Sequence, residues 1–389
     1  MSKITHICLC GPFTDGWTYQ ENLLSKFHKK MGLDVDVICS QFVWDTKGNI
    51  VKSEKDNYID ENGANIIRIP SNFNTNIKSK IRFYKGVYKA ICESAPDIIF
   101  VHGVQGPAIS KIVKYAKKHK DVTIYVDNHA DFSNSARSWL SKNILHRILW
   151  KHYAKKIEPY TEKFYGVLPA RVNFLHDVYG IPKEKIELLV MGADDDLVRP
   201  AADPSVRHEI RNKHNVDEDD FMIVTGGKID AFKMQTLLLM EAVKELNNPK
   251  VKLIVFGSVS DDIIGKVEDL SDGMIVKYIG WINPNDSYKY FAASDLVVFP
   301  GRHSVFWEQV VGQGIPMLVK RWNGTEHVNY CGNVDFIDED TVDAIKDKLE
   351  SLIGKEKYET MLENAKKASN EFCYSGIAEK SIKRSVSRN

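Results

Sequence analysis

The sequence predicts an α/β protein that consists of two doubly wound domains. Short apolar runs alternate with longer segments of helical periodicity along most of the 389 residues, which is typical of parallel sheets covered by helices on both faces. The alternation pauses at residues 191–200, a stretch of Gly, Asp and Pro that we interpret as a linker, and then starts again. We expect a first domain over 1–195, a second over 196–372, and a C-terminal helix over 373–389 that can return to the first domain.

Each domain has enough apolar runs for a sheet of its own. The strands expected in the first domain are Ile4–Cys10, Val35–Cys39, Ile66–Ile69, Asp97–His102, Val122–Val126, Phe164–Val167 and Ile186–Leu189. Those expected in the second are Phe221–Thr225, Val251–Phe256, Met274–Tyr278, Asp295–Phe299, Pro316–Val319 and Val334–Ile337. Ligands of open α/β sheets bind at the carboxyl ends of the strands. We therefore expect two Rossmann-like domains that face a ligand-binding cleft.

Charge and cysteine content exclude several classes of protein. The 53 Lys and Arg residues nearly cancel the 52 Asp and Glu residues, which argues against a nucleic-acid partner. Six cysteines are too few and too scattered for a disulfide framework, and Cys8-x-Cys10 lacks the second pair that a zinc site needs. The sequence shows no signal peptide and no apolar run of about 18 residues, so we expect a cytoplasmic protein.

Residues 11–17, Gly-Pro-Phe-Thr-Asp-Gly-Trp, follow the first expected strand and open a helix. Backbone N–H groups and the helix dipole at such a place can face an anion or a sugar. We expect Gly16 to contact a donor substrate, and Asp15 and Trp17 to lie on the acceptor side. A plain glycine turn is the alternative.

A second glycine turn, Gly226-Gly227-Lys228, follows the first strand of the second domain, and Lys233 stands at the start of the next expected helix. Glycine allows a diphosphate to approach closely, and two ammonium groups can neutralise the charge that develops as it departs. We expect Gly227, Lys228 and Lys233 to bind a donor diphosphate, and the two lysines to contribute to catalysis. A pair of solvated surface lysines is the alternative.

Residues 299–316 run from a strand through a loop into a helix, and Glu308 falls in the first turns of that helix. Its carboxylate can accept hydrogen bonds from two vicinal hydroxyl groups, such as those of a ribose. A Glu early in a helix is otherwise only a favourable partner of the helix dipole.

Together these motifs resemble the retaining, nucleotide-sugar-dependent glycosyltransferases of family 4, of the type that builds bacterial surface polysaccharides. The family has the GT-B fold, and the resemblance covers nearly the whole chain. It rests on residues 11–17, Met191–Asp194 with Arg199-Pro200, Gly227-Lys228 with Lys233, and Glu308 with Gly314-Ile315-Pro316. The resemblance implies that the two lysines hold the donor diphosphate, that Glu308 binds the nucleotide ribose, and that no metal or other cofactor is required.

The chain departs from the family pattern around the donor sugar. Counted back from the Gly-x-Pro turn, the ribose-binding position falls on Gln309, so Glu308 matches only if one residue has been inserted. The family has a further Glu eight residues earlier, where this chain has Pro or Gly. We expect His303, or the backbone amides of Ser304 and Val305, to make the sugar contacts instead. A loop-capping role for His303 is the alternative.

The first domain offers a catalytic candidate at the end of its strand 122–126. Family members commonly have a His at a comparable strand end, and the resemblance implies that His129 orients a hydroxyl of the donor sugar. A His bonded to loop backbone is the alternative, and His102 is a second candidate. Asp131 can act as a base on the acceptor side. In the second domain, Trp281 follows the third strand and can pack near the nucleobase.

Two acidic runs, Asp194–Asp196 and Asp217–Asp220, raise the question of a metal site. Both lie in stretches rich in turn-forming residues. We interpret them as a solvated linker and a turn, and we expect no metal ligand among the site residues.

The near-zero net charge hides a difference between the two halves. Residues 1–200 contain 29 basic and 22 acidic residues, a balance of +7, and the remainder contains 24 and 30, a balance of −6. Two segments without any acidic residue, 78–89 and 135–156, carry much of the excess and interleave it with aromatic and aliphatic residues. Such helices suit an anionic membrane surface, so we expect peripheral contact with the inner face of a membrane. A helix packed on its own domain is the alternative.

The expected activity is transfer of a sugar from a nucleotide diphosphate sugar, with UDP as the favoured nucleotide, to a hydroxyl of a glycan or lipid-linked glycan. The expected enzyme is hexosyltransferase-like. A catalytically lapsed nucleotide- or glycan-binding homologue and a GT-B-like nucleotide-sugar epimerase are the alternatives.

Overall fold

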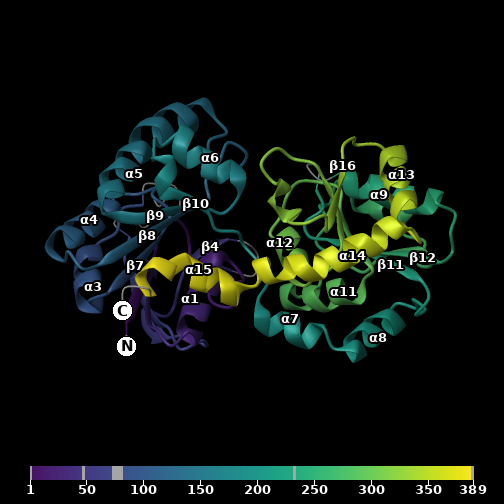
Figure 1. Cartoon of the computed structure of the whole chain (residues 1–389), viewed down its shortest axis with the longest axis horizontal. Helices are drawn as coiled ribbons and strands as arrows, with labels where there is room; N and C mark the ends of the chain where they lie inside the picture. Colours follow the sequence, from purple (N-terminus) through teal and green to yellow (C-terminus); the bar gives the residue numbers. More distant parts are fainter. Residues whose placement is uncertain (1, 46–48, 72–81, 231–233, 387–389) are drawn as a thin grey trace. The chain divides into compact units, whose positions relative to one another are not determined.

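The computed structural model describes residues 2–45, 49–71, 82–230 and 234–386, and the chain forms two compact units (Figure 1). The first unit is Met1–Val190 together with Ile377–Asn389, and the second is Met191–Gly376. The boundaries expected from the sequence, at residues 195 and 372, lie within a few residues of these.

The first unit is built on an eight-stranded sheet in the order β10-β9-β8-β7-β1-β2-β6-β5. Seven of its strands were expected, and they are β1 (Lys3–Cys8), β2 (Asp34–Ser40), β6 (Asn65–Ile69), β7 (Ile98–His102), β8 (Thr123–Asn128), β9 (Thr161–Gly166) and β10 (Ile186–Leu188). The edge strand β5 (Asn57–Ile59) pairs antiparallel with β6. The sequence missed β5 and the small β3–β4 hairpin (Phe42–Trp44 and Ile50–Lys52), because three-residue runs carry no period.

The two faces of this sheet are covered differently. One face is aliphatic and packs against α3 (Val87–Ser94), α4 (Ile109–Lys118), α5 (Lys151–Ile157) and α6 (Pro169–Asp177). The other face carries a row of stacked rings that includes Phe100, Tyr125 and Tyr165. Helices α1 (Gln20–Lys30) and α15 (Tyr374–Val386) cover this second face (Figure 1), where the Tyr165 hydroxyl donates to the Ser381 carbonyl at 3.0 Å.

The second unit is built on a parallel six-stranded sheet in the order β13-β12-β11-β14-β15-β16. Its strands, all expected, are β11 (Phe221–Gly226), β12 (Val251–Phe256), β13 (Val276–Tyr278), β14 (Leu296–Phe299), β15 (Met317–Lys320) and β16 (Val334–Ile337). Its helices are α7 (Asp195–Ala201), α8 (Pro204–Lys213), α9 (Gln235–Glu245), α10 (Ile264–Leu270), α11 (Ser287–Ala293), α12 (Phe306–Gly312), α13 (Val342–Leu352) and α14 (Glu356–Ala368).

Residues 191–200 are not a solvated linker, because they belong to the packed fold of the second unit. The backbone of Ala193 exchanges hydrogen bonds with Phe372 and Tyr374 at 2.7 and 3.0 Å. The Asp194 side chain is buried and accepts from Asp196 N at 3.0 Å, which caps α7. A run of three aspartates suggested solvent exposure, but short acidic side chains are also the preferred N-caps of helices.

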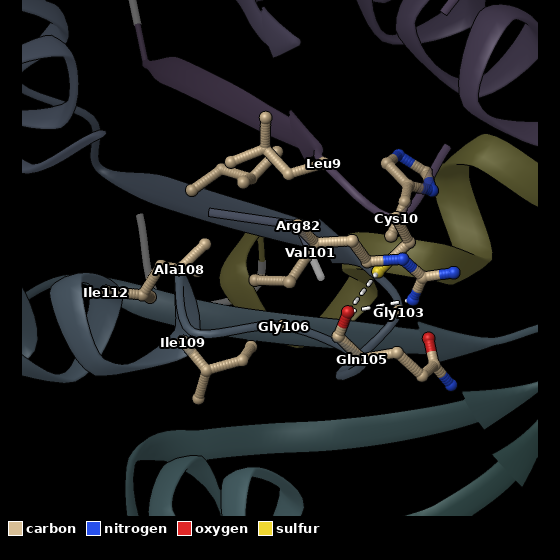
Figure 2. A pocket seen from close by; sticks show the side chains of 12 residues that line it. Leu9, Cys10, Arg82, Val101, Gly103, Gln105, Gly106, Ala108, Ile109 and Ile112 are labelled. Atoms are coloured by element: carbon tan, nitrogen blue, oxygen red, sulfur yellow. Dashed lines mark hydrogen bonds between the residues drawn. The ribbon is translucent and has the colours of Figure 1, made fainter. Parts of the chain in front are cut away.

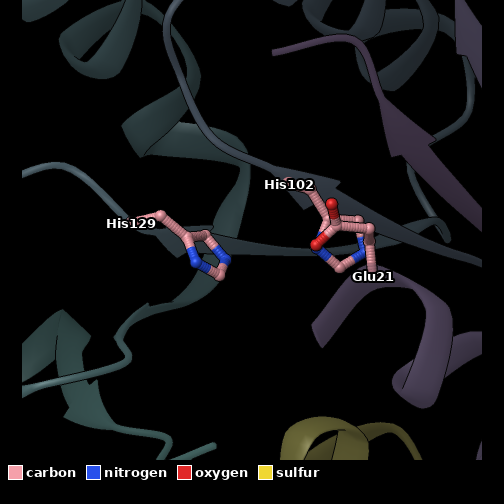
Figure 3. A group of neighbouring side chains, drawn as sticks. All are labelled: Glu21, His102 and His129. Carbon is pink, nitrogen blue, oxygen red and sulfur yellow. The ribbon is translucent and has the colours of Figure 1, made fainter. Parts of the chain in front are cut away.

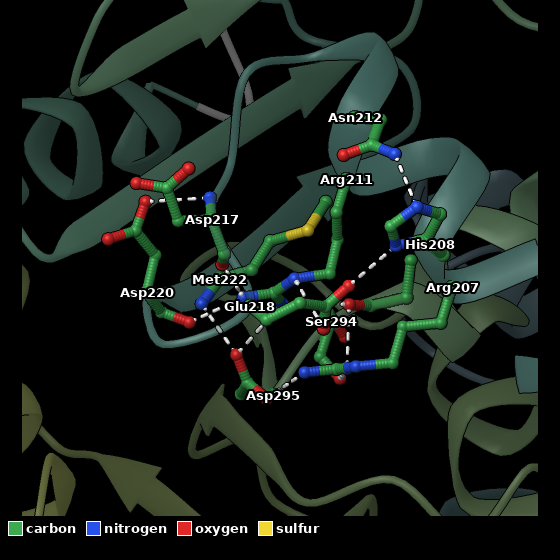
Figure 4. A network of polar contacts seen from close by, with 11 residues as sticks. Arg207, His208, Arg211, Asn212, Asp217, Glu218, Asp220, Met222, Ser294 and Asp295 are labelled. Carbon is green, nitrogen blue, oxygen red and sulfur yellow. Dashed lines mark hydrogen bonds and ion pairs between the residues drawn. The ribbon is translucent and has the colours of Figure 1, made fainter.

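The other acidic run, Asp217–Asp220, forms the expected turn, closed by a hydrogen bond from Asp220 N to Asp217 O at 3.1 Å. The buried guanidinium of Arg211 donates to the carbonyl groups of Asp217 and Asp220 at 2.6 and 2.5 Å (Figure 4). Lys250 Nζ lies 3.4 Å from the Asp220 carboxylate. Lys250 therefore pairs with the Asp220 side chain, and Arg211 holds the backbone of the turn that leads into β11.

Candidate functional site

Each sheet has one point at which its winding reverses, and ligands of doubly wound sheets bind outside the carboxyl ends of the strands at such a point. In the first unit the reversal lies between β1 and β7, and in the second between β11 and β14. The glycine turns identified from the sequence, residues 11–17 and 226–228, follow β1 and β11. Both therefore lie at the reversals.

The turn after β11 is built from positions that only glycine can occupy. A Cβ on Gly226 would lie 2.3 Å from the ring of Phe256. Gly227 has φ of 115°, and its N–H donates to Phe256 O at 3.1 Å. Gly257, after β12, has φ of 130°, and a Cβ there would lie 1.8 Å from the Gly227 carbonyl oxygen. The backbone at these two strand ends is thus packed closely without side chains, and Gly226 and Gly227 remain half-buried.

Lys228 extends from this turn with its side chain 71% exposed, and its Nζ lies 3.4 Å from an Asp230 carboxylate oxygen. This weak, exposed ion pair leaves the ammonium group accessible to an anion. Lys233, the other expected diphosphate ligand, lies outside the described residues.

The loop after β14 leads into α12, where two imidazoles meet the carboxylate of Glu308. His303 Nε2 and His327 Nε2 lie 2.8 and 2.9 Å from the same oxygen, Glu308 Oε1. Glu308 is fully buried, and its Oε2 has no hydrogen-bond partner among the described residues. Burial alone would raise the pKa of Glu308, but the two imidazoles lower this pKa to about 2. The carboxylate is therefore ionised at neutral pH.

This arrangement changes what Glu308 can offer a ribose. The sequence suggested a carboxylate that accepts from two vicinal hydroxyl groups, but Oε1 is already occupied and Oε2 is buried. The alternative residue, Gln309, is also buried, at 2% exposure. His327 was missed because it follows β15, nineteen residues after Glu308, and no spacing rule connects the two.

The remaining donor-side candidates lie at different distances from the reversal. Ser304 and Val305 are half-buried and lie between His303 and α12. The Trp322 indole N–H, from the loop after β15, donates to the Gly301 carbonyl at 3.1 Å and so holds the start of this loop. Trp281 is 66% exposed and follows β13, two strands from β11. Its neighbour Gly280 accepts from Gly257 N at 2.8 Å, and the contact of Trp281 with a nucleobase stays a prediction.

In the first unit, the loop after β1 is held by its own contacts. Gly16 has φ of 71°, which favours glycine. The Tyr58 hydroxyl donates to Asp15 Oδ2 at 2.8 Å, and Arg68 Nη2 lies 3.5 Å from Oδ1. Trp17 stacks on Trp44 with ring centroids 6.5 Å apart. Trp17 is half-buried, so part of its indole remains available to an acceptor.

His102, His129 and Glu21 lie close together where β7 and β8 end (Figure 3). Between the two histidines, Asp127 is fully buried, and its Oδ2 lies 2.7 Å from His102 Nδ1 and 3.2 Å from His129 Nε2. Burial would lower the pKa of His129, but the Asp127 carboxylate raises it overall. The His129 side chain is 36% exposed, whereas those of His102 and Asp127 are buried.

Ligand atoms of Glu21, His102 and His129 lie within 4.8 Å of one another, as in a metal site. However, both ring nitrogens of His102 are already engaged, Nδ1 by Asp127 at 2.7 Å and Nε2 by His6 Nδ1 at 3.0 Å. An imidazole binds a metal through a free lone pair, which His102 lacks. His102 is therefore committed to its hydrogen bonds with Asp127 and His6.

Asp131, expected as a base, is committed to its own loop. Its Oδ1 accepts from Ser133 N, Ser133 Oγ and Asn134 N at 2.7, 2.6 and 3.1 Å, and its Oδ2 accepts from Arg171 Nε at 3.1 Å. Burial would raise the pKa of Asp131, but these donors lower it. Such a carboxylate stabilises a turn and takes up a proton poorly.

Near the reversal of the first unit lies a small pocket of about 10 Å³, lined by residues that include Cys10, Arg82 and Gly103 (Figure 2). Arg82 Nη1 donates to the Gln105 carbonyl at 2.8 Å across it. A cavity of this size holds at most one water molecule. It is a small packing defect inside the first unit, and it is too small to hold a substrate.

Residues 206–368 match the family described as Glycosyl transferases group 1. The second unit is a group 1 glycosyl transferase domain. No curated protein matches the chain by sequence.

Solved structures of similar fold match this glycosyltransferase chain over nearly its whole length. A glycosyltransferase from Rickettsia africae has a TM-score of 0.69 at 15% identity, over 98% of this chain and 97% of its own. HepE from Anabaena, in complex with UDP, has a TM-score of 0.68 at 16% identity, over 100% of both chains. UDP-GlcNAc 2-epimerase from Neisseria meningitidis, bound to UDP-GlcNAc, has a TM-score of 0.63 at 12% identity, over 100% of both chains.

These findings confirm the GT-B fold and a glycosyltransferase enzyme. The narrower assignment to family 4 and the retention of configuration stay predictions.

Proposed function

We propose that this glycosyltransferase moves a sugar from a UDP-linked sugar to a hydroxyl group of a glycan or lipid-linked glycan, with retention of configuration. The observation that carries the proposal is the β11–β14 reversal of the group 1 domain, with its glycine backbone, exposed Lys228 and ionised Glu308. The UDP bound to HepE, which has a similar fold, supports the choice of nucleotide.

In the proposed reaction, the bond between the anomeric carbon and the diphosphate oxygen breaks, and the acceptor oxygen bonds to the same face of that carbon. The acceptor proton passes to an oxygen of the departing diphosphate. Lys228 and Lys233 stabilise the charge on this leaving group, which is the main electrostatic contribution. Glu308 Oε2 accepts from a ribose hydroxyl once the surrounding side chains uncover it, and His129 orients a hydroxyl of the donor sugar. No metal ion or other cofactor takes part.

A nucleotide-release assay over a panel of sugar nucleotides, with and without a lipid-linked acceptor extract, tests this function. We expect acceptor-dependent release of UDP that a chelator leaves unchanged. Lys228→Ala and Lys233→Ala should each lower kcat at least about tenfold, because each removes a cation from the leaving group. The KM for the acceptor should change much less. Unchanged turnover in both variants would contradict the assignment of the diphosphate site.

An epimerase is the second candidate, because the enzyme from N. meningitidis shares the fold over the full length of both chains. It predicts inversion at C2 of the donor sugar in the absence of any acceptor. A lapsed homologue predicts that the nucleotide binds and that neither reaction occurs. The same panel, analysed for transferred sugar and for C2 inversion, separates the three outcomes.

Within the described residues, no helix combines the length and the apolar composition that a bilayer crossing requires. The first unit nevertheless exposes an apolar-basic patch along the π-helical segment η1 (Ser141–Trp150) and just before it. The exposed apolar residues of this patch are Phe132, Trp139, Leu140, Ile144, Ile148 and Leu149. The basic residues of the patch are Arg137, Lys142, Arg147 and Lys151, and residues 135–157 contain no carboxylate side chain.

The structure corrects the extent of this surface in two places. Leu145 and Trp150, expected on the same apolar side, pack into the core instead. Arg82, in the other basic segment, is half-buried, and its guanidinium donates to Gln105 O and lies over the Trp150 ring. Residues 78–81 of that segment lie outside the described residues. We propose that the apolar-basic patch rests on an anionic membrane, where a lipid-linked acceptor is found.

The double variant Trp139→Ser/Ile148→Ser tests the membrane contact. It should lower binding to anionic liposomes by about tenfold or more, because two side chains that are 72% and 65% exposed would lose burial in the interface. Met274→Ser is the matched control, since Met274 is 73% exposed but belongs to the second unit. Co-sedimentation that does not depend on anionic lipid, or that falls equally in the control, would remove the proposal.

A further inference from the structure

Three buried imidazoles and one carboxylate form a continuous chain across the ring-bearing face of the first sheet. His28 Nδ1, on α1, lies 3.0 Å from His6 Nε2, on β1. His6 Nδ1 lies 3.0 Å from His102 Nε2, and His102 Nδ1 lies 2.7 Å from Asp127 Oδ2. The four side chains are 6% exposed or less. In such surroundings each contact needs a proton between its two atoms, because an unpaired polar group costs free energy.

Each end of this chain faces an oxygen that carries no proton, a carboxylate at one end and a backbone carbonyl at the other. At one end, burial would raise the pKa of Asp127, but the neighbouring imidazoles lower it, so the carboxylate is ionised. At the other end, His28 Nε2 lies 3.1 Å from the carbonyl oxygen of Ala378 and 3.0 Å from Ser381 Oγ, both on α15. The Ser381 hydroxyl donates to that same carbonyl at 2.8 Å. Each end therefore requires an N–H from the chain.

With the Ser381 hydroxyl proton donated to Ala378 O and not to His28, counting protons gives the chain a positive charge. Two contacts between rings and two end contacts require four N–H protons on three rings. Three neutral imidazoles carry only three such protons. One ring must therefore be an imidazolium.

We propose that the chain of His28, His6 and His102 holds one excess proton, with His102 as the imidazolium opposite Asp127 and the other two as neutral Nε2–H tautomers. Burial lowers the pKa of His6 well below its usual value and that of His28 to about 4, so neither ring is the site of the charge. His102 adjoins the carboxylate, which compensates the charge.

The excess proton matters for His129, which shares Asp127 Oδ2 at 3.2 Å. A compensated Asp127 attracts a proton on His129 less than a bare carboxylate would. The other charged groups that act on His129 are Glu21 on α1, which raises its pKa, and Arg171 on α6, which lowers it. Burial raises the pKa of the Cys8 and Cys10 thiols nearby, so they are neutral. His6 and His28 are thus positioning residues. Any effect that they have on catalysis passes through His129 and rests on its proposed role.

Nitrogen-15 NMR of the histidine side chains in the full-length protein tests the protonation states directly. We expect both nitrogens of His102 to be protonated at neutral pH, and His6 and His28 to show the Nε2–H tautomer. A neutral His102, or a His6 protonated at Nδ1 alone, would overturn the proposal. This measurement needs no substrate, so its result does not depend on whether the proposed sugar transfer is observed.

His28→Leu and His28→Asn provide a matched pair, since Leu and Asn have nearly the same shape. Leu removes the acceptor for His6 Nε2–H and the link to Ala378, so the chain no longer requires a fourth proton. His102 should become neutral, and the pKa of His129 should rise by about one unit. In His28→Asn the amide oxygen can accept from His6, so both readouts should stay close to those of the unchanged protein. Equal pKa values of His129 in the two variants would contradict the chain, and circular dichroism verifies that both are folded.

Discussion

Glu308→Gln is expected to lower kcat/KM for sugar transfer by more than about a hundredfold, equivalent to about 3 kcal/mol. The carboxylate is fully buried and holds His303 and His327 through one oxygen. An amide preserves the shape but removes the negative charge that orders the two imidazoles. It also places a donor where the proposed ribose hydroxyl requires an acceptor. Steady-state kinetics with the best donor of the panel measures the effect.

Gln309→Leu, a companion variant, separates the two registers that the sequence left open. Gln309 is buried, and its side-chain oxygen has no partner among the residues that the structure describes. We expect a loss of less than about tenfold, because within the described residues both imidazoles are hydrogen-bonded to Glu308 and neither to Gln309. If Gln309→Leu abolished donor binding and Glu308→Gln did not, the ribose position would belong to Gln309.

Glu308→Gln should also change the pH dependence of stability. The folded-state pKa of Glu308 is about 2 and the ordinary value is 4.5, so the unfolded chain binds this proton more readily. The contribution of Glu308 to the free energy of unfolding is therefore complete above pH 4.5 and disappears as the pH falls towards 2. Between these values the unchanged protein should lose stability more steeply than the variant, which denaturant titrations at several pH values measure. Parallel curves would show that the ion pair adds nothing to folding.

The parts of this protein that local patterns determine were predicted from the sequence. The thirteen expected strands form because continuous Val, Ile and Phe runs suit parallel strands buried on both faces. Gly227 and Lys228 were predicted to follow the first strand of the second domain, and the strand order of the structure places that strand end at the reversal. Asp194 shows the limit of such patterns, because a run of three aspartates is equally typical of a solvated linker and of a helix N-cap.

Contacts between distant segments escaped prediction for a physical reason. His327 reaches Glu308 from another loop, and the histidine chain draws one side chain each from α1, β1 and β7 before it ends on β8. No one-dimensional period connects such residues, because the register of neighbouring strands and helices decides which of them meet. Single buried histidines in a strand-like run also look like ordinary core residues. Their hydrogen-bonding requirement becomes visible only when the partners are known.

Gly257→Ala is expected to lower the free energy of unfolding of the second unit by about 4 kcal/mol, because two penalties coincide at this position. Its φ of 130° is rarely adopted by residues with a side chain, and the new Cβ would lie 1.8 Å from the carbonyl oxygen of Gly227. That oxygen belongs to the backbone of the turn after β11 (residues 226–228), so it cannot move aside as a flexible side chain would. We expect a thermal transition lower by about 10 °C and a loss of nucleotide binding in the fraction that still folds.

Gly265→Ala provides the matched control for this variant, because Gly265 lies in α10 with nothing within 4 Å of a new Cβ. Alanine is preferred over glycine inside a helix by about 1 kcal/mol, so this substitution should leave the transition unchanged or raise it slightly. Calorimetry of the two full-length variants gives the comparison. Similar unfolding temperatures would mean that the ends of β11 and β12 can move apart to accept the new Cβ. The absence of a side chain at Gly257 would then not determine the conformation of the turn after β11.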